Sequence, residues 1–289
     1  MNSIPGVCAG HWTHESGTTG VSAFLFPAGA RAGFAQPGHA PGSRELGTLD
    51  PTHLAPVIHG FCLSGGSAFG LAAADGVMAY LEEQGIGLAV AGHTVPLVPS
   101  VILFDLPVAV ARPDAAAGHR AAAAAMAGGP LAEGRVGAGA GARVGKAFSN
   151  IVPGGFGVET RRVGGWTVSA AMAVNAYGGI RDPDTGAWLA GGPQAQPTLS
   201  PEPMLGQNTT IGVVVTDAPL DRAQCTVLAQ MAAAGMARAV EPAFTPFDGD
   251  TILVAATGRD GAVDPVHLCQ LGWTAAGCVG RAIARAVNG

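Results

Sequence analysis

Charged residues are scarce in this sequence. Asp, Glu, Lys and Arg make up 12% of the 289 residues, and the formal net charge at pH 7 is −5. Proteins that bind nucleic acid carry a basic face that neutralises a run of phosphates. This composition provides no such face, so we expect no nucleic-acid partner.

Paired cysteines are also lacking. The five cysteines are odd in number, widely spaced and free of any C-x-x-C pair; they are Cys8, Cys62, Cys225, Cys269 and Cys278. Disulfide frameworks and zinc sites depend on such pairs, so we expect reduced, mostly buried thiols and a cytoplasmic protein. Among the eight histidines, only His11 and His14 approach the spacing of metal ligands. We expect these two in a mobile N-terminal arm, and we predict no metal and no cofactor.

The sequence has no uninterrupted apolar run long enough to cross a membrane. Residues 85–104 are uncharged, but His93, Pro96 and Pro99 interrupt them. We interpret this segment as strand and loop in a protein core, and we expect no membrane partner. Residues 1–6 show no basic stretch followed by an apolar one, so no secretory signal is expected either.

Apolar residues and glycine, by contrast, are plentiful. Hydrophobic residues make up 48% of the chain, and there are 45 glycines. A chain of this length can bury about three quarters of the surface that its unfolded form exposes. We therefore expect one domain spanning residues 1–289, with many turns and no internal repeat.

Short strand-like runs alternate with alanine-rich helical runs, which indicates an α/β or α+β sandwich. A hairpin is predicted to pair residues 21–26 with residues 31–34 around Pro27. Ser67 stands where the N-cap of a predicted helix at 68–84 should be, and Gly85 stands where that helix should stop. The other predicted elements are strands at 167–173, 211–216 and 251–257 and helices at 115–127, 220–240 and 266–287.

A polar junction at residues 206–210 separates a proline-rich segment from the apolar run at 211–215. The segment 186–208 contains four prolines and few large apolar side chains, so we expect it to be exposed and mobile. If the peptide bond before Thr209 were cut, this residue would carry both a nucleophilic hydroxyl and a free α-amine as its base. The alternative to a cleavage site is a linker between domains, in which Thr209 is simply the first residue of a strand.

Several short motifs occur in a distinctive order between residues 15 and 257. They are PGSRE (41–45), LSGGSAFGL (63–71), VPLVP (95–99), RVGAG (135–139) through Gly145 and Lys146, VNAYG (174–178), and NTT (208–210) followed by VVVTDA (213–218). In this order and spacing they resemble the L-aminopeptidase D-Ala-esterase/amidase family, which includes the β-peptidyl aminopeptidases. Each motif alone is weak, but the ordered set is specific.

The resemblance implies an α+β fold, a four-layer αββα sandwich like that of the N-terminal-nucleophile hydrolases. It also implies self-cleavage between Asn208 and Thr209 into an α chain (1–208) and a β chain (209–289), assembled as a tetramer of processed αβ pairs. The substrate would be a small molecule or short peptide. The range covers N-terminal amides, β-peptides, D-amino-acid amides or esters, and pantetheine-like amides. Many relatives have Ser where this sequence has Thr209, and either hydroxyl can act as the nucleophile.

The same resemblance assigns roles to three further residues. Asn175 matches the asparagine of the oxyanion hole, although without the resemblance it would be interpreted as a turn residue. Asp250 has the same negative charge as a glutamate that lies near the nucleophile in relatives. Asp248 replaces a serine, and this departure weakens the expected recognition of a substrate ammonium group. The two aspartates flanking Gly249 could also simply form a turn.

The resemblance places Gly66, Ser67 and Phe104 at the substrate-binding site. Ser67 also permits a different hypothesis, because Ser67, Asp217 and His267 follow the order of a serine esterase triad; however, Phe69 replaces the second glycine of a nucleophile elbow. Residues 139–146 lack the spacing of a phosphate-binding loop, so nucleotide binding is rejected. Two further functions remain open: acyl transfer to an amine, and binding by an uncleaved protein without activity.

Overall fold

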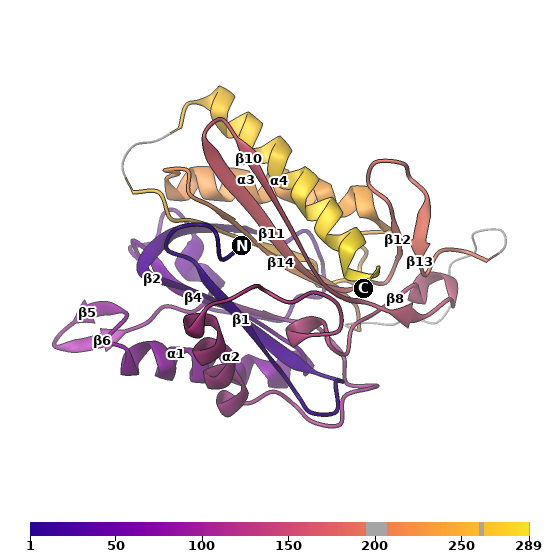
Figure 1. Cartoon of the computed structure of the whole chain (residues 1–289), viewed down its shortest axis with the longest axis horizontal. Helices are drawn as coiled ribbons and strands as arrows, with labels where there is room; N and C mark the ends of the chain where they lie inside the picture. The colour runs from indigo at the N-terminus through magenta and orange to yellow at the C-terminus, as the bar shows by residue number, and fades with distance from the viewer. Residues whose placement is uncertain (195–206, 260–262, 289) are drawn as a thin grey trace.

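The computed structural model describes residues 1–194, 207–259 and 263–288 (Figure 1). Residues 195–206, most of the proline-rich segment expected to be mobile, lie outside the described residues. The described flanks of that segment depart from the prediction. Residues 188–190 form a strand with half-buried side chains, and Asn208 is fully buried. The expected exposed junction is therefore wrong.

A mixed sheet of nine strands dominates the fold, in the order β10-β11-β14-β16-β2-β4-β7-β3, with β1 also paired to β2. The pairs β14–β16 and β4–β7 are parallel and the others antiparallel. The strands of this sheet are β1 (Cys8–Thr13), β2 (Gly20–Ala35), β3 (Ser43–Arg44), β4 (Ile58–Ser64), β7 (Ser100–Ile102), β10 (Gly155–Val163), β11 (Trp166–Asn175), β14 (Thr209–Thr216) and β16 (Thr251–Ala256). Shorter strands outside it are β5 (Leu88–Val90), β6 (His93–Val95), β8 (Arg143–Val144), β9 (Val152–Pro153), β12 (Gly179–Arg181), β13 (Trp188–Ala190) and β15 (Val240–Glu241).

The α-helices of the described residues are α1 (Ala73–Glu83), α2 (Ala115–Ala127), α3 (Arg222–Ala239) and α4 (Pro265–Ala286). The last three agree with the prediction within two residues at each end. Each follows an aspartate whose carboxylate accepts a hydrogen bond from an N–H of the first turn, namely Asp114, Asp221 and Asp264. Short 3₁₀ turns occur at Leu46–Leu49, Ser67–Ala72, Gly137–Gly139 and Lys146–Phe148.

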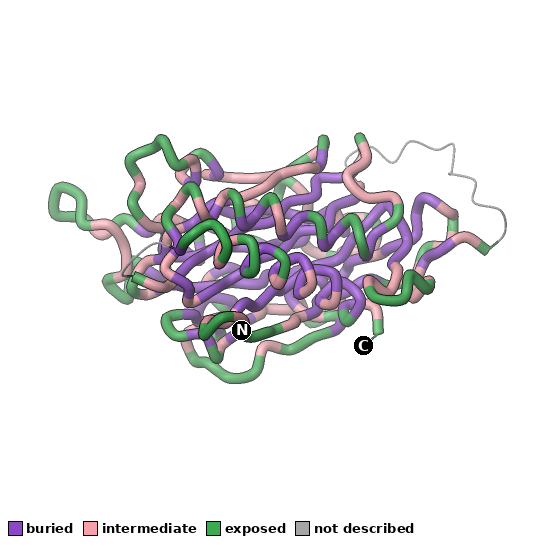
Figure 2. The backbone as a smooth tube through the Cα atoms, turned by 90° about the horizontal axis from the view of Figure 1, so that it is seen from above, coloured by how far each residue is buried: buried purple, intermediate pink, exposed green. Residues whose placement is uncertain are grey.

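Two halves of the sheet face each other, and helices cover both outer sides (Figures 1 and 2). Alternate side chains of β14 enter different layers: Ile211 and Val213 pack between the halves, whereas Val214 packs against α3 and α4. On the other half, Phe61 faces the inner layer and Cys62 faces α1 and α2. The layers therefore run helix, sheet, sheet, helix, and the prediction of an α+β sandwich is confirmed.

The predicted hairpin around Pro27 is wrong. Residues 20–35 form the single strand β2, which passes from one half of the sheet to the other. Its first part pairs with β4, and its last part pairs with β16. The register shifts between Leu25 and Ala30, where Gly29 has a φ of 77°. The chain bends here and continues as one strand. The residues on the two sides of Pro27 do not pair with each other, because each side pairs with a strand from a distant part of the sequence.

The predicted cap at Ser67 is also wrong. Gly66 and Ser67 have φ values of 83° and 55° and lead into a 3₁₀ turn, so that α1 begins only at Ala73. No side-chain hydrogen bond caps either the turn or α1. The expectation of a mobile N-terminal arm fails too. His11 lies in β1, where its ring is 2.9 Å from the Ser22 hydroxyl and burial lowers its pKa to about 4.

Candidate active site

The predicted site residues lie at one end of the sheet, where β11 ends and β14 and β16 begin. Asn175, the last residue of β11, is directly opposite Thr209, the first residue of β14. Asn208 forms a parallel bridge with Asp248, just before β16. The apolar runs of these three strands hold their ends together, so residues far apart in sequence meet in a buried environment. Thr209 itself is only 3% exposed.

The carbonyl oxygen of Asn208, in the peptide bond before Thr209, accepts two hydrogen bonds. The Gly249 amide donates one of 2.9 Å, and the Thr209 hydroxyl donates the other. A β-carbon at Gly249 would lie 3.0 Å from Thr209 Oγ1, which places the Gly249 backbone directly against the hydroxyl. Donors aimed at a carbonyl oxygen stabilise negative charge that develops there when the carbonyl carbon is attacked.

The side chain of Asn175 is fixed on both sides. Its amide nitrogen donates to the carbonyl oxygens of Phe104 (3.0 Å) and Gln207 (3.1 Å), and its Oδ1 accepts from the Arg143 amide (2.9 Å). The asparagine is 1% exposed. A side chain held in this way is preorganised as a hydrogen-bond donor, which is the property that an oxyanion hole requires.

Lys146 is the only lysine of the sequence, and it is buried beside Asn175. Its ammonium group donates to the carbonyl oxygen of Asn175 (2.9 Å), to Asn175 Oδ1 (3.1 Å) and to the carbonyl oxygen of Gln207 (3.2 Å). Burial, together with the nearby charge of Arg143, lowers the pKa of Lys146 to about 7. The residue therefore exchanges its proton close to neutral pH, a property typical of catalytic lysines.

Asp248 and Asp250 are both buried, each 1% exposed. Asp250 accepts hydrogen bonds from the amides of Thr210 (2.6 Å) and Phe244 (3.2 Å). Asp248 accepts from the amides of Thr245 (3.0 Å) and Tyr177 (3.3 Å). Burial raises the pKa of both carboxyls, and the neighbouring Asp248 helps to raise that of Asp250 to about 8. The two aspartates therefore place buried, hydrogen-bonded carboxyls next to the start of β14, where Asp250 contacts the Thr210 amide.

The three predicted substrate-binding residues lie along one side of this cluster. The Phe104 carbonyl contacts Asn175, as described above. The Ser67 amide donates to the carbonyl oxygen of Leu103 (3.0 Å), and the Gly66 amide donates to Asp105 Oδ1 (2.7 Å). Asp105 is 1% exposed, and burial raises its pKa. Its carboxyl thus joins the Gly66 turn to the segment that contacts Asn175.

The serine esterase arrangement is not assembled. Asp217 accepts a hydrogen bond from the Thr167 amide, and the His267 ring packs edge-on against Trp166 at 5.4 Å. Both contacts are at the beginning of β11, whereas Ser67 is connected through residues 103 and 104 to the end of that strand. The ten residues of β11 separate these two places by about 30 Å. Ser67 therefore has no acid or histidine partner of this triad nearby.

Sequence reasoning assigned no role to Lys146 or Gly249, and it placed Asp105 only in a loop expected to line the pocket. Lys146 had a detectable signal, since a single lysine in a chain of 289 residues stands in an alanine- and glycine-rich stretch. Gly249 acts through its backbone amide, and the burial of Asp105 is set by tertiary packing. Neither the position of a backbone amide nor the burial of one aspartate can be predicted from a local sequence pattern.

The described residues offer no obvious metal site or membrane span. Within residues 1–194, 207–259 and 263–288, no group of three or more His, Cys, Asp and Glu side chains could hold a metal ion. In the same ranges, no helix combines the length and the apolar character that crossing a membrane requires. All five cysteines are free thiols, and three of them are buried.

Comparisons with known proteins show which family the chain resembles. A model of peptidase family S58 matches residues 1–288. An uncharacterized aminopeptidase of Mycobacterium tuberculosis is 37% identical, over 98% of this chain and 92% of its own length. A 6-aminohexanoate-oligomer endohydrolase of Kocuria sp. is 31% identical, over 88% of this chain and 74% of its own length.

Solved structures show the same fold. A β-aminopeptidase of Burkholderia sp. superposes with a TM-score of 0.73 at 26% identity, over 99% of this chain and 85% of its own. The L-aminopeptidase D-Ala-esterase/amidase of Ochrobactrum anthropi, described as a variant of the Ntn hydrolase fold, superposes with a TM-score of 0.71 at 19% identity, over 99% and 84%. The resemblance noted in the sequence is confirmed.

Proposed function

The chain belongs to peptidase family S58 and is an amide hydrolase, and we propose that it processes itself and then hydrolyses substrates through Thr209 as an N-terminal nucleophile. The observation that supports this proposal most strongly is the Asn208 carbonyl, whose oxygen accepts hydrogen bonds from both the Thr209 hydroxyl and the Gly249 amide. The peptide bond is also buried, so an external protease could not reach it without unfolding this end of the sheet.

In the proposed maturation step, Thr209 Oγ1 attacks the carbonyl carbon of Asn208. A C–O bond forms, the C–N bond breaks, and the released nitrogen takes up a proton, which leaves an ester between the two chains. Water then hydrolyses the ester, restoring the hydroxyl and giving Asn208 a terminal carboxylate. The products are an α chain (1–208) and a β chain (209–289). During the attack, the Gly249 amide stabilises the oxyanion.

Before cleavage the nitrogen of Thr209 is an amide and cannot accept a proton, so another base is needed. We assign this role to Lys146, because burial lowers its pKa to about 7 and it lies beside Asn175, the cross-strand partner of Thr209. After cleavage, the α-amine of Thr209 becomes available. Its unperturbed pKa of about 7.7–8.0 suits it to accept the hydroxyl proton in each turnover.

Cleavage also frees two hydrogen-bond donors that contact the chain's own backbone before cleavage. Asn175 Nδ2 and Lys146 Nζ both donate to the carbonyl oxygen of Gln207 in the uncleaved chain. When the end of the α chain moves away, these donors can bind the carbonyl oxygen of a substrate. Asn175 then forms the oxyanion hole of turnover, while Asp248 and Asp250 hold the Thr209 amine or the substrate's amino group.

The proposed substrates are short amides with a small or unbranched acyl group. The relatives support this class, since one is a β-aminopeptidase and another is an endohydrolase of 6-aminohexanoate oligomers. The proposed assembly is a tetramer of processed αβ pairs. Transfer of the acyl group to an amine uses the same acyl-enzyme and differs only in the final acceptor.

The test compares two adjacent threonines. Thr209→Val removes the proposed nucleophilic hydroxyl, whereas Thr210→Val removes a buried hydroxyl that makes no hydrogen bond within the described residues. Each variant and the wild type would be incubated with the linear dimer of 6-aminohexanoate, a β-alanyl dipeptide and L-alanine amide, and released amine would be measured. We expect hydrolysis by the wild type and Thr210→Val but not by Thr209→Val. Hydrolysis that persists in Thr209→Val would contradict the assignment, and hydroxamate formed with added hydroxylamine would reveal an acyl-enzyme.

A further inference from the structure

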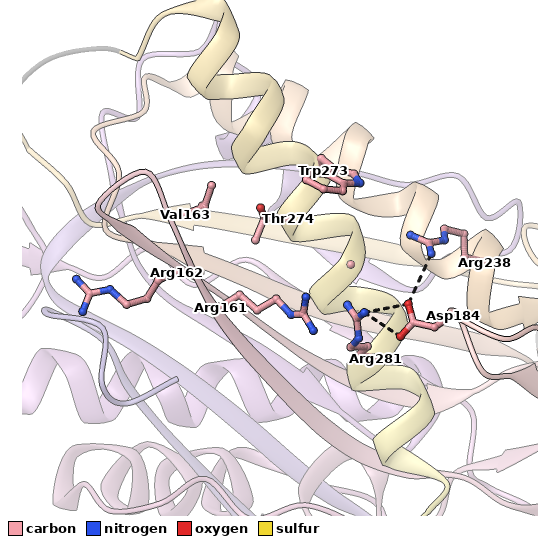
Figure 3. Close-up of a pocket in the computed structure, with 9 residues that line it drawn as sticks. Arg161, Arg162, Val163, Asp184, Arg238, Trp273, Thr274 and Arg281 are labelled. Carbon is pink, nitrogen blue, oxygen red and sulfur yellow. Dashed lines mark hydrogen bonds and ion pairs between the residues drawn. The ribbon is translucent and has the colours of Figure 1, made fainter.

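A pocket lies on the outer face of α4 (Figure 3). Its volume is about 350 Å³, which is at the lower end of the range for small-molecule sites. Its lining comes from β10, the turn between β12 and β13, the end of α3, and α4. The lining residues are Arg161, Arg162, Val163, Asp184, Arg238, Trp273, Thr274, Gly277 and Arg281.

The charge of this pocket is opposite to that of the chain. The lining contains four arginines and one carboxylate, although the protein as a whole carries a formal charge of −5. Asp184 lies 2.8 Å from Arg281 and 4.0 Å from Arg238, and it therefore holds these two guanidinium groups toward each other. Arg161 is held by Glu159 at 3.1 Å, and Figure 3 shows its guanidinium pointing toward Arg281.

Most donors of these arginines remain unused. Each guanidinium has five N–H groups. In the described part of the chain, Arg281 uses Nη2 for Asp184, Arg238 uses Nη2 for the Pro183 carbonyl, and Arg161 uses Nε for Glu159. The carboxylates thus orient the arginines without saturating them. Planar, oriented guanidinium groups bind dianionic groups through paired hydrogen bonds.

One row of α4 combines an aromatic surface with this charge. Trp273, Gly277 and Arg281 are spaced four residues apart and so lie along one face of the helix. Trp273 is 75% exposed, an unusual position for the largest apolar side chain. A β-carbon at Gly277 would meet only Arg281 Nη1, at 3.4 Å. The glycine therefore leaves a notch beside the Arg281 guanidinium, which reaches back to the level of Gly277, one turn (about 6 Å) along the helix from Trp273.

We propose that this pocket binds a small aromatic dianion, an aryl phosphate or an aromatic dicarboxylate, with its ring on Trp273 and its anionic group on Arg161, Arg238 and Arg281. This site is separate from the catalytic one. Arg161 pairs with Val168 on β11, whereas Asn175 lies seven residues further along that strand, about 23 Å away. Binding here does not depend on the identity of the nucleophile.

The test is isothermal titration calorimetry at low salt with phenyl phosphate, benzene-1,3-dicarboxylate and inorganic phosphate. We expect saturable binding of the two aromatic dianions and weaker binding of inorganic phosphate. Arg281→Gln should weaken all three at least about tenfold. Trp273→Ala should weaken the aromatic probes about three- to tenfold and leave inorganic phosphate unchanged.

Arg285→Gln is the matched control, since Arg285 lies one turn further along α4 and pairs with Glu133 outside the pocket. It should bind all probes like the wild type. The proposal is overturned if the aromatic probes give no saturable heat up to 10 mM, or if Arg281→Gln and Arg285→Gln behave alike. A third result would also overturn the proposal: Trp273→Ala changes the oligomeric state, and no probe binds the wild type. This face of α4 would then be an interface between copies of the chain.

Discussion

The backbone amide of Gly249 donates a hydrogen bond of 2.9 Å to the carbonyl oxygen of Asn208. This bond joins the start of β14 to the segment before β16, two parts of the chain that the parallel pairing of these strands brings together. The same amide belongs to the residue between Asp248 and Asp250. One short segment therefore supplies both the proposed donor for the developing oxyanion and two buried carboxyls near Thr209.

Gly249→Ala should slow self-cleavage. An added β-carbon would lie 2.7 Å from the Ala40 carbonyl oxygen and 3.0 Å from Thr209 Oγ1, so the amide and the hydroxyl would be pushed apart. We expect the rate to fall at least about tenfold, as for loss of an oxyanion donor. Denaturing gels over time would measure it. Gly47→Ala is the control, because its β-carbon would meet nothing closer than the His53 ring at 4.0 Å; equal rates in the two variants would contradict the role of Gly249.

Asn175→Asp should reduce turnover by about a hundred- to a thousandfold, mainly in kcat. The aspartate retains an acceptor for the Arg143 amide but loses the donor that Nδ2 provides. Steady-state kinetics with the best amide substrate would show the effect. Asn150→Asp is the control, because it changes the same group at a site where the amide nitrogen donates to the Gly192 carbonyl oxygen. If both variants lost kcat equally, Asn175 would not be an oxyanion donor.

Self-cleavage should become faster as the pH rises through about 7. Burial lowers the pKa of Lys146 to about 7, so the neutral amine that can accept a proton accumulates above that pH. Lys146→Arg stays charged and should remove this rise. Arg143→Gln removes a positive charge that lowers the pKa of Lys146, and the midpoint should then move to higher pH. Cleavage rates measured from pH 5 to 9 would show this, and an unchanged profile in Lys146→Arg would exclude lysine as the base.

The buried carboxyl of Asp250 should make the fold more stable in mild acid. Its pKa is raised to about 8, whereas in the unfolded chain it is about 4. Between these values the folded state holds the proton more tightly, so this contribution to the free energy of unfolding falls as the pH rises from about 4 to about 8. Urea unfolding of Thr209→Ala at pH 5 and pH 7 should show the fall, and Asp250→Asn in that background should reduce it. The same difference in both proteins would contradict the shift.

Local patterns predicted part of this fold, and long-range pairing decided the rest. The helix at residues 115–127 was predicted to the residue, because alanine content and its cap are local features. The hairpin around Pro27 was wrong, since the partners of β2 come from β4 and β16 rather than from β2 itself. Ser67 was misplaced because two consecutive left-handed residues redirect the chain before α1.

The candidate site shows the same division. The resemblance predicted Thr209, Asn175, Asp248 and Asp250 as site residues, and the strand pairings bring these residues together. Lys146 received no role, because its burial and its bonds to Asn175 arise only in the folded chain. The predicted exposure of the junction failed for a related reason. The prolines and the scarcity of large apolar side chains suggested an exposed segment, but Asn208 and Thr209 enter the end of a buried sheet.

The central claim is that Thr209 cuts the chain before itself, and intact mass under denaturing conditions tests it most directly. The wild type and Thr209→Ser should each give two chains, residues 1–208 and 209–289, because either hydroxyl can attack the Asn208 carbonyl. Thr209→Ala should give one uncut chain. A single chain in the wild type after prolonged incubation, or two chains in Thr209→Ala, would contradict the account.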